Sequence, residues 1–234
     1  IDVNRQNAKA YCMLKYYKTA VSRYEALKAM GDRSFTTLYY LGVSQYADNW
    51  PYGARDNLLE AHRKNPMDVN VLYYLAKACA RSSWKEEGIA YMNKAFDMVV
   101  PTDSMMIRLY DGLLECYKFH TKADPYEKIE VMKEAYSYTK KYTLFYQIAE
   151  IYDYQKDYVN AVHYYEKYMA LVPKNKQTAL DSEGNPLPNA DTMYQKARRR
   201  VEKIKVEDFF RNGAHDDYFE PKFIRLDTKK VELK

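Results

Sequence analysis

The sequence of 234 residues predicts an all-α solenoid built from repeated helix–turn–helix units. Three observations support this prediction. Small and bulky apolar residues recur every 34 residues, and within each period the apolar positions are spaced three or four residues apart. The chain also has only 7 glycines and 8 prolines, which is few for a turn-rich all-β fold. Most of the 26 tyrosines then serve as packing residues between helices.

The 34-residue period is seen in both halves of the proposed unit. The first half recurs in register as Leu38, Tyr40, Leu41 and Gly42 and then as Leu72, Tyr74, Leu75 and Ala76. The second half recurs three times, as Ala20, Tyr24 and Leu27, as Ala54, Leu58 and Ala61, and as Gly88, Met92 and Ala95. Each half is predicted to be one helix, because polar breaks separate the apolar stretches. The small residues are expected to let neighbouring helices approach closely.

This pattern resembles the tetratricopeptide repeat (TPR) family, whose two helices carry bulky, small and aromatic residues at set positions before a closing proline. The clearest copy comprises Phe145, Ile148, Ala149, Tyr152, Ala161, Tyr165, Tyr168 and Pro173. Another comprises Leu38, Leu41, Gly42, Ala54, Leu58, Ala61 and Pro66. The resemblance implies a right-handed α-solenoid of TPR-type units, followed here by a C-terminal capping helix and an extended tail.

The repeat array is expected over residues 1–175, with units at about 1–34, 35–68, 69–102, 103–141 and 142–175. The fourth unit is longer than the others, and we expect the turn 120–125 to absorb its extra residues and to project from one rim. The first 34 residues are either two helices or one long helix from about Asn7 to Met30. A chain that starts at a repeat without a polar cap is also compatible with a longer array or self-association.

The period is lost after Pro173. Residues 176–190 are predicted to form an irregular loop, and residues 191–212 a capping helix with an apolar stripe of Tyr194, Ala197, Val201, Ile204 and Phe209. The tail, residues 213–234, is predicted to be mostly extended, and it could lie along the solenoid surface or occupy its groove.

Several kinds of chemistry are disfavoured by the sequence. The glycines include no G-x-G arrangement for a phosphate loop, and the four histidines match no catalytic or metal-binding motif. Cys12, Cys79 and Cys116 lack zinc-site spacing and are expected to be small buried side chains. We therefore predict no enzyme activity, no cofactor and no metal site.

The charge pattern also limits the choice of partner. The net charge of +5 is small and interspersed, so nucleic-acid binding is not implied, although Arg198, Arg199 and Arg200 could form a weak basic patch. No run of about 18 apolar residues exists, so no transmembrane segment is predicted. The compartment stays open, because a cytoplasmic protein and one exported to the periplasm or cell envelope would share this composition.

The TPR resemblance implies that a protein or peptide segment binds in a concave groove lined by the first helix of each unit. The predicted partner-binding residues are Tyr39, Val43, Tyr46, Tyr73, Lys77, Arg81, Arg108, Tyr146 and Glu150. Other groove positions are Thr36, Asn70, Asp111, Glu115, Lys118 and Asp153. Of the tyrosines, only Tyr39, Tyr46, Tyr73 and Tyr146 are expected to be free to contact a partner.

The groove sequence predicts a non-catalytic scaffold or adaptor. Some TPR proteins bind a chaperone's terminal carboxylate through Lys and Asn, but Tyr39 and Val43 stand at those positions here, so that role is not expected. Lys77, Arg81 and Arg108 could attract another anionic segment or simply be solvated. Two alternatives are a cell-envelope module that stacks tyrosines on carbohydrate and a weak nucleic-acid binder acting through the basic capping helix.

Overall fold

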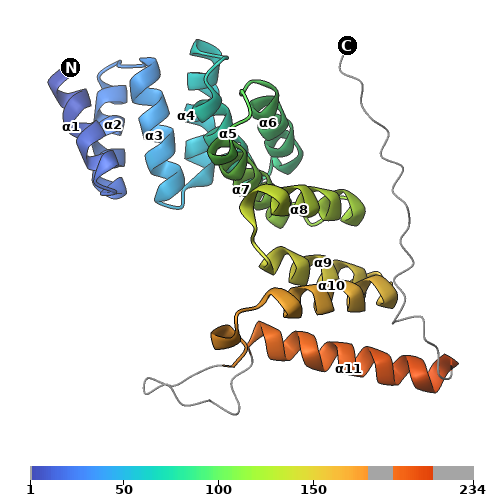
Figure 1. Ribbon diagram of the computed structural model, residues 1–234. Coiled ribbons are helices and arrows are strands. Elements are labelled where there is room, and N and C mark those ends of the chain that lie inside the picture. Colours follow the sequence, from blue (N-terminus) through green and yellow to red (C-terminus); the bar gives the residue numbers. More distant parts are fainter. Residues whose placement is uncertain (1, 179–191, 213–234) are drawn as a thin grey trace. The chain divides into compact units, whose positions relative to one another are not determined.

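The computed structural model describes residues 2–178 and 192–212, and α-helices form most of this part of the chain (Figure 1). The chain divides into two compact units, Ile1–Thr139 and Lys140–Lys234. The all-α prediction is confirmed for the described residues, in which consecutive helices pack against one another. The predicted tail and residues 179–190 of the predicted loop lie outside the described residues.

Within residues 2–139, consecutive helices lie side by side in chain order (Figure 1). These helices are α1 (Asp2–Met13), α2 (Tyr17–Ala29), α3 (Phe35–Ala47), α4 (Pro51–Lys64), α5 (Val69–Ala80), α6 (Lys85–Asp97), α7 (Asp103–Phe119) and α8 (Pro125–Thr139). The α5 helix also contacts α3 and α7, so the first helices of successive pairs adjoin one another.

The first 34 residues form two helices, and the alternative of one long helix is wrong. Lys15 has a φ of 64°, in the left-handed region, and this conformation ends α1 and reverses the chain. Asn49, 34 residues later, has a φ of 65° at the equivalent turn before α4. Asparagine commonly adopts this conformation but lysine rarely does, so the first turn gave no signal in the sequence.

Polar caps begin the first helix of three successive pairs at strict 34-residue intervals. The side chains of Ser34, Asp68 and Thr102 accept hydrogen bonds from backbone N–H groups in the first turns of α3, α5 and α7. Such bonds satisfy donors that have no partner within the helix. The spacing was present in the sequence but was not recognised there, because the apolar pattern alone had located the repeats.

The extra residues of the fourth pair lie mainly in a helix, which corrects the prediction that the turn absorbs them. The α7 helix has 17 residues, whereas α5 has 12. The turn between α7 and α8 comprises only residues 120–124. The apolar and small residues of α7 continue the helical spacing, so the chain lengthens the helix instead of the loop.

Small residues permit close helix packing, as the sequence predicted. A Cβ atom at Gly42 would lie 2.5 Å from Cγ of Leu58, so α3 and α4 touch at this position. At Gly88, a Cβ atom would lie 2.8 Å from the backbone oxygen of Ala76, where α6 crosses α5. Both contacts are closer than a methyl group allows, and the glycines thus set the distance between paired helices.

Asp32 joins the first pair of helices to the second. Its carboxylate accepts hydrogen bonds from Arg5 Nε at 2.6 Å, from Thr37 Oγ1 at 2.7 Å and from the backbone N–H of Ser34 at 3.1 Å. Asp32 is only 7% exposed. The hydrogen bond from Arg5, with those from Thr37 and Ser34, holds the pKa of this carboxyl far below its ordinary value despite burial.

The second unit contains α9 (Thr143–Tyr154), α10 (Tyr158–Leu171), a short 3-10 helix (Lys174–Lys176) and α11 (Met193–Asn212) among its described residues. The α11 helix packs on α10 and buries Ala197, Val201 and Ile204, as expected for a capping helix. Phe209 was predicted to belong to this apolar stripe, but it is 57% exposed because it lies beyond the covered part of the helix.

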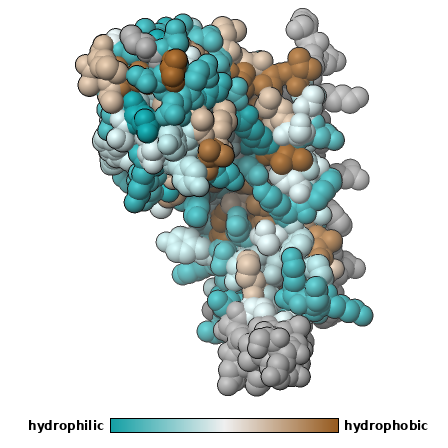
Figure 2. Space-filling view, turned by 90° about the vertical axis from the view of Figure 1, so that its left-hand side faces the viewer, coloured by the Kyte–Doolittle hydropathy of each residue, from teal (hydrophilic) through white to brown (hydrophobic). Residues whose placement is uncertain are grey.

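Apolar side chains on the visible face of the molecule form small separate groups among hydrophilic ones (Figure 2). Isolated apolar groups of this kind are ordinary on protein surfaces. In the described residues, no helix has the length and apolar character needed to cross a membrane.

Candidate functional site

Seven of the nine predicted partner-binding residues lie on adjoining helices of the first unit. Tyr39, Val43 and Tyr46 lie on α3, Tyr73 and Lys77 on α5, Arg81 at its C-cap and Arg108 on α7. We call the surface formed by α3, α5 and α7 the first-helix surface. The other two, Tyr146 and Glu150, lie on α9 in the second unit, so the structure does not assign them to this surface.

Tyrosine rings form a connected cluster on the first-helix surface. Tyr74 lies at its centre, with ring centroids 6.3 Å from Tyr39, 6.2 Å from Tyr46 and 5.2 Å from Tyr73, all in edge-to-face geometry. Tyr39 also stacks on Phe35 at 5.9 Å. These rings hold one another in place and form a rigid aromatic platform.

The tyrosines differ in their exposure. Tyr39 and Tyr46 are partly exposed, but Tyr73 is only 9% exposed, so the prediction that it is free to contact a partner is wrong. Its ring instead supports two cations, with Lys77 Nζ at 5.0 Å and the Arg108 guanidinium at 4.4 Å from its centroid. Burial raises the pKa of Tyr39, which keeps its hydroxyl neutral at physiological pH.

Lys77, Glu115 and Tyr46 meet at one point of the first-helix surface. Lys77 Nζ lies 2.9 Å from Glu115 Oε2, and the Tyr46 hydroxyl donates a hydrogen bond to Glu115 Oε1. Although burial opposes the charge of Lys77, its contacts with Glu115 and the neighbouring tyrosines raise its pKa. Burial and the bond to Glu115 raise the pKa of Tyr46 to about 12. Lys77 therefore stays charged and the Tyr46 hydroxyl stays neutral at neutral pH.

Two arginines of the surface are held by neutral partners. Arg81 Nη2 donates to Asn49 Oδ1 at 2.8 Å, and its guanidinium lies 5.1 Å from the Tyr46 ring centroid. Arg108 Nη1 donates to Asn70 Oδ1 at 2.9 Å. Among the described residues, neither arginine forms an ion pair with a carboxylate. Their positive charges are positioned but not neutralised, as in a site that attracts an anion.

Val43 supplies an apolar contact between the aromatic residues. It is partly buried and packs against two neighbouring core clusters, one containing Leu41 and the other containing Leu58. Its predicted place on the first-helix surface is compatible with this packing. A partner would find little of its side chain accessible.

The second unit holds its predicted residues in other contacts. The Tyr146 ring packs against Tyr165 and Tyr168, with centroids 5.5 Å and 5.3 Å apart, and burial beside Glu150 raises its pKa to about 12. Glu150 is exposed. Asp153 was predicted to line the groove, but it forms a two-bond ion pair with Arg200 of α11 and is therefore part of the capping contact.

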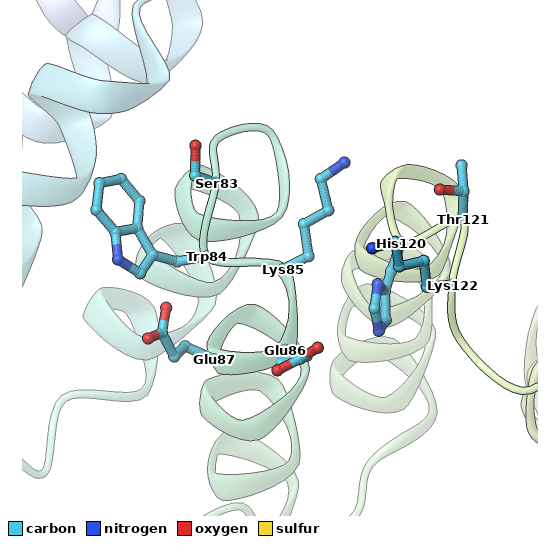
Figure 3. A pocket seen from close by; sticks show the side chains of 8 residues that line it. All are labelled: Ser83, Trp84, Lys85, Glu86, Glu87, His120, Thr121 and Lys122. Atoms are coloured by element: carbon cyan, nitrogen blue, oxygen red, sulfur yellow. The ribbon is translucent and has the colours of Figure 1, made fainter.

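A small pocket of about 290 Å³ on the first unit is lined by none of the predicted partner-binding residues (Figure 3). The N-terminal turn of α6 contributes Trp84, Lys85 and Glu87, and the turn after α7 contributes His120 and Lys122. Figure 3 shows the acidic side chains of Glu86 and Glu87 and the basic side chains of Lys85 and Lys122 in its lining, so no single charge dominates the pocket. It brings together no recognisable set of catalytic groups.

Among the described residues, no cysteine is a strong nucleophile and the acidic groups form no metal site. Cys12, Cys79 and Cys116 are buried as predicted. Burial raises the pKa of Cys79 to about 11 and that of Cys116 to about 12, so both remain unreactive thiols at neutral pH. In the described part of the chain, no group of three or more His, Cys, Asp or Glu residues is arranged to hold a metal ion.

The paired helices, with the first helices of successive pairs side by side, form a TPR-type helical-repeat fold. Solved TPR structures share this fold. The C-terminal part of a TPR repeat-containing protein from Cytophaga hutchinsonii is 18% identical, with a TM-score of 0.66, and the match covers 92% of this chain and 76% of that one.

Two further structures match the fold at a TM-score of 0.58. YrrB, described as a TPR protein with an unusual peptide-binding site, is 13% identical over 73% of this chain and 86% of its own. MamA from MSR-1 is 15% identical over 72% of this chain and 94% of its own. No family model matches the sequence, and no curated protein matches it either. The similarity therefore shows the fold alone.

Proposed function

We propose that this chain is a non-catalytic scaffold or adaptor that binds a segment of a partner protein on the first-helix surface. The observation that carries the proposal is the positioning of Arg81 and Arg108 beside tyrosine rings, with neutral hydrogen-bond partners only among the described residues. Positioned arginines and rigid aromatic rings are the side chains that most often dominate protein interfaces. The peptide-binding site named for YrrB gives independent support for this use of the fold.

The tyrosines and the arginines of the first-helix surface would contribute to binding in different ways. Tyr39 and Tyr46 offer contact area at a small entropic cost, because neighbouring rings already fix their orientation. Arg81 and Arg108 supply the charge that selects the partner. The buried Tyr73 ring contacts the Arg108 guanidinium and holds it in position. Tyr146 and Glu150 would form a separate contact on α9.

The test is affinity capture of partners from the native host with the wild-type chain and with Arg81→Glu plus Arg108→Glu. Charge reversal at both positions is expected to remove the specific partners, because it places negative charges opposite the partner's acidic groups and like charges repel strongly at an interface. The matched control is Arg63→Glu plus Lys94→Glu, which makes the same charge change at exposed positions of α4 and α6. Identical partners for wild type and both variants would refute the proposal.

The two alternative functions receive less support. Three cations of α11 form ion pairs within the chain: Arg200 with Asp153 at 2.6 Å, Lys205 with Glu166 at 2.7 Å and Arg198 with Glu202 at 3.3 Å. These ion pairs reduce the positive charge that α11 could offer to a nucleic acid. Carbohydrate stacking requires open aromatic faces, whereas the rings of the first-helix surface contact one another or cations. No observation favours either alternative over a protein partner.

A further inference from the structure

The Glu115 carboxylate is bound by the chain in the way that a partner's carboxylate would be bound. Glu115 lies on α7. Its carboxylate accepts a hydrogen bond from the Tyr46 hydroxyl of α3 and forms an ion pair with Lys77 Nζ of α5. Lys77 also donates to the Tyr73 hydroxyl at 3.3 Å and lies 5.2 Å from the Tyr46 ring centroid. We call this set of donors, Tyr46 and Lys77, the carboxylate cradle.

The cradle is accessible enough for its occupant to be exchanged. The side chains of Lys77 and Glu115 are 16% and 24% exposed. Glu115 reaches the cradle from a neighbouring helix through a flexible side chain, and its release requires only rotation about side-chain bonds. Another carboxylate could therefore take its place without unfolding of the helices.

The two arginines flank the cradle along α5. Asn70, which holds Arg108, and Arg81 are separated by 11 positions on this helix, or about 16 Å at the ordinary rise per residue. Lys77 lies between them. An extended segment of about five residues spans that distance. Of Lys77, Arg81 and Arg108, only Lys77 forms an ion pair with a carboxylate among the described residues, so the two arginines remain to attract further carboxylates.

We propose that Glu115 acts as an internal occupant of the carboxylate cradle, and that a side-chain carboxylate of an acidic peptide segment displaces it while flanking carboxylates bind Arg81 and Arg108. This inference rests on the proposed function and specifies the partner's chemistry. Glu115 thereby sets the number of acidic residues that a segment needs in order to bind. A segment with one acidic residue gains little by exchange, whereas a segment with several acidic residues also gains the contacts to the arginines.

The test measures fluorescence anisotropy of a labelled, C-terminally amidated hexaglutamate peptide with the purified chain. Glu115→Gln is expected to tighten binding about tenfold, which corresponds to Glu115 occupying the cradle nine-tenths of the time. Glutamine keeps the size of the side chain and an acceptor for Tyr46. Glu115→Asp, which keeps the charge on a shorter side chain, is expected to fall between glutamine and wild type.

Three controls test which groups cause any increase in affinity. Glu130→Gln makes the same charge change at an exposed position of α8 and is expected to leave affinity unchanged. Labelled hexaglutamine is expected not to bind. Hexaglutamate with a free C-terminus is expected to bind no more than twofold more tightly than the amidated peptide, because side-chain carboxylates make the contacts. A dominant effect of the free terminus would overturn the assignment to side chains.

The outcomes separate this inference from the proposed function. Unchanged or weaker binding by Glu115→Gln overturns the inference, since Glu115 then either does not compete or assists binding. If Arg81→Glu plus Arg108→Glu still abolishes capture of the native partner in that case, the proposed function stands without the exchange. Absence of hexaglutamate binding by wild type and by Glu115→Gln also overturns the inference.

Discussion

At the scale of single residues, Asp32 shows how one side chain can join consecutive repeats. Its carboxylate gathers donors from α1, from the start of α3 and from the turn between α2 and α3. Its removal would leave Thr37, which is fully buried, without this hydrogen-bond partner. Unsatisfied buried polar groups are costly, so Asp32 contributes more than an exposed ion pair would.

Asp32→Ala is expected to lower the free energy of unfolding by about 2 kcal/mol at neutral pH, the cost of leaving buried donors unpaired. Because the pKa of Asp32 is lowered in the folded chain, its contribution is present above its unfolded pKa, near the ordinary value of 3.8, and decreases as pH falls below it. Urea unfolding at several pH values measures both effects. An unchanged difference between variant and wild type from pH 7 to pH 3 would contradict this account.

Residues of the first-helix surface were predicted in part. The 34-residue period located Lys77, Arg81 and Arg108 on first helices, because register alone determines which face of a helix a residue occupies. Register does not determine which side chains meet across three helices. The contact of Tyr46 on α3 with Glu115 on α7 depends on how closely the helices pack, and the burial of Tyr73 depends on the rings around it.

At the scale of helices and turns, apolar spacing predicted the helices more reliably than their ends. Residues in the middle of a helix repeat the apolar pattern several times, whereas an end depends on one or two residues. Ser34, Asp68 and Thr102 are suitable caps that recur with the period. Lys15, by contrast, ends α1 in a conformation that its side chain does not favour.

The turn at Lys15 gives a direct test of this point. Lys15→Gly is expected to raise the free energy of unfolding by about 0.5 kcal/mol, because glycine adopts positive φ without the steric cost that lysine bears. Urea unfolding measures the change. The matched control is Lys18→Gly on the first turn of α2, where the same substitution is expected to destabilise by about 0.8 kcal/mol. Destabilisation of equal size at both positions would contradict the assigned turn.

At the scale of the whole molecule, tyrosine is the main aromatic packing residue. Of the 26 tyrosines, Tyr24, Tyr117, Tyr165 and Tyr168 are almost completely buried. Burial raises the pKa of Tyr46, Tyr110 and Tyr146 to about 12. The unfolded chain ionises its tyrosines near pH 10, and it therefore releases protons that the folded chain retains.

The chain is expected to be unusually sensitive to alkali. Each raised tyrosine pKa contributes stability below pH 10, and this contribution is lost as pH rises from 10 to 12, by at most about 1.4 kcal/mol per pH unit for each tyrosine. The part of the tyrosinate absorbance change that occurs above pH 10, which reports the buried tyrosines, and the circular dichroism are expected to change together in one cooperative step. Complete ionisation of the tyrosines near pH 10 with the helices intact would show that the rings are not sequestered.

The extensive burial of α5 has an evolutionary consequence. Eight of its residues are buried, whereas α2 has three buried residues. A substitution in α5 must fit neighbours on several sides, while most positions of α2 can change freely. Among descendants of a common ancestor, α5 should therefore change slowly and α2 quickly, and a distant homologue would be recognised first by the stretch from Val69 to Ala80.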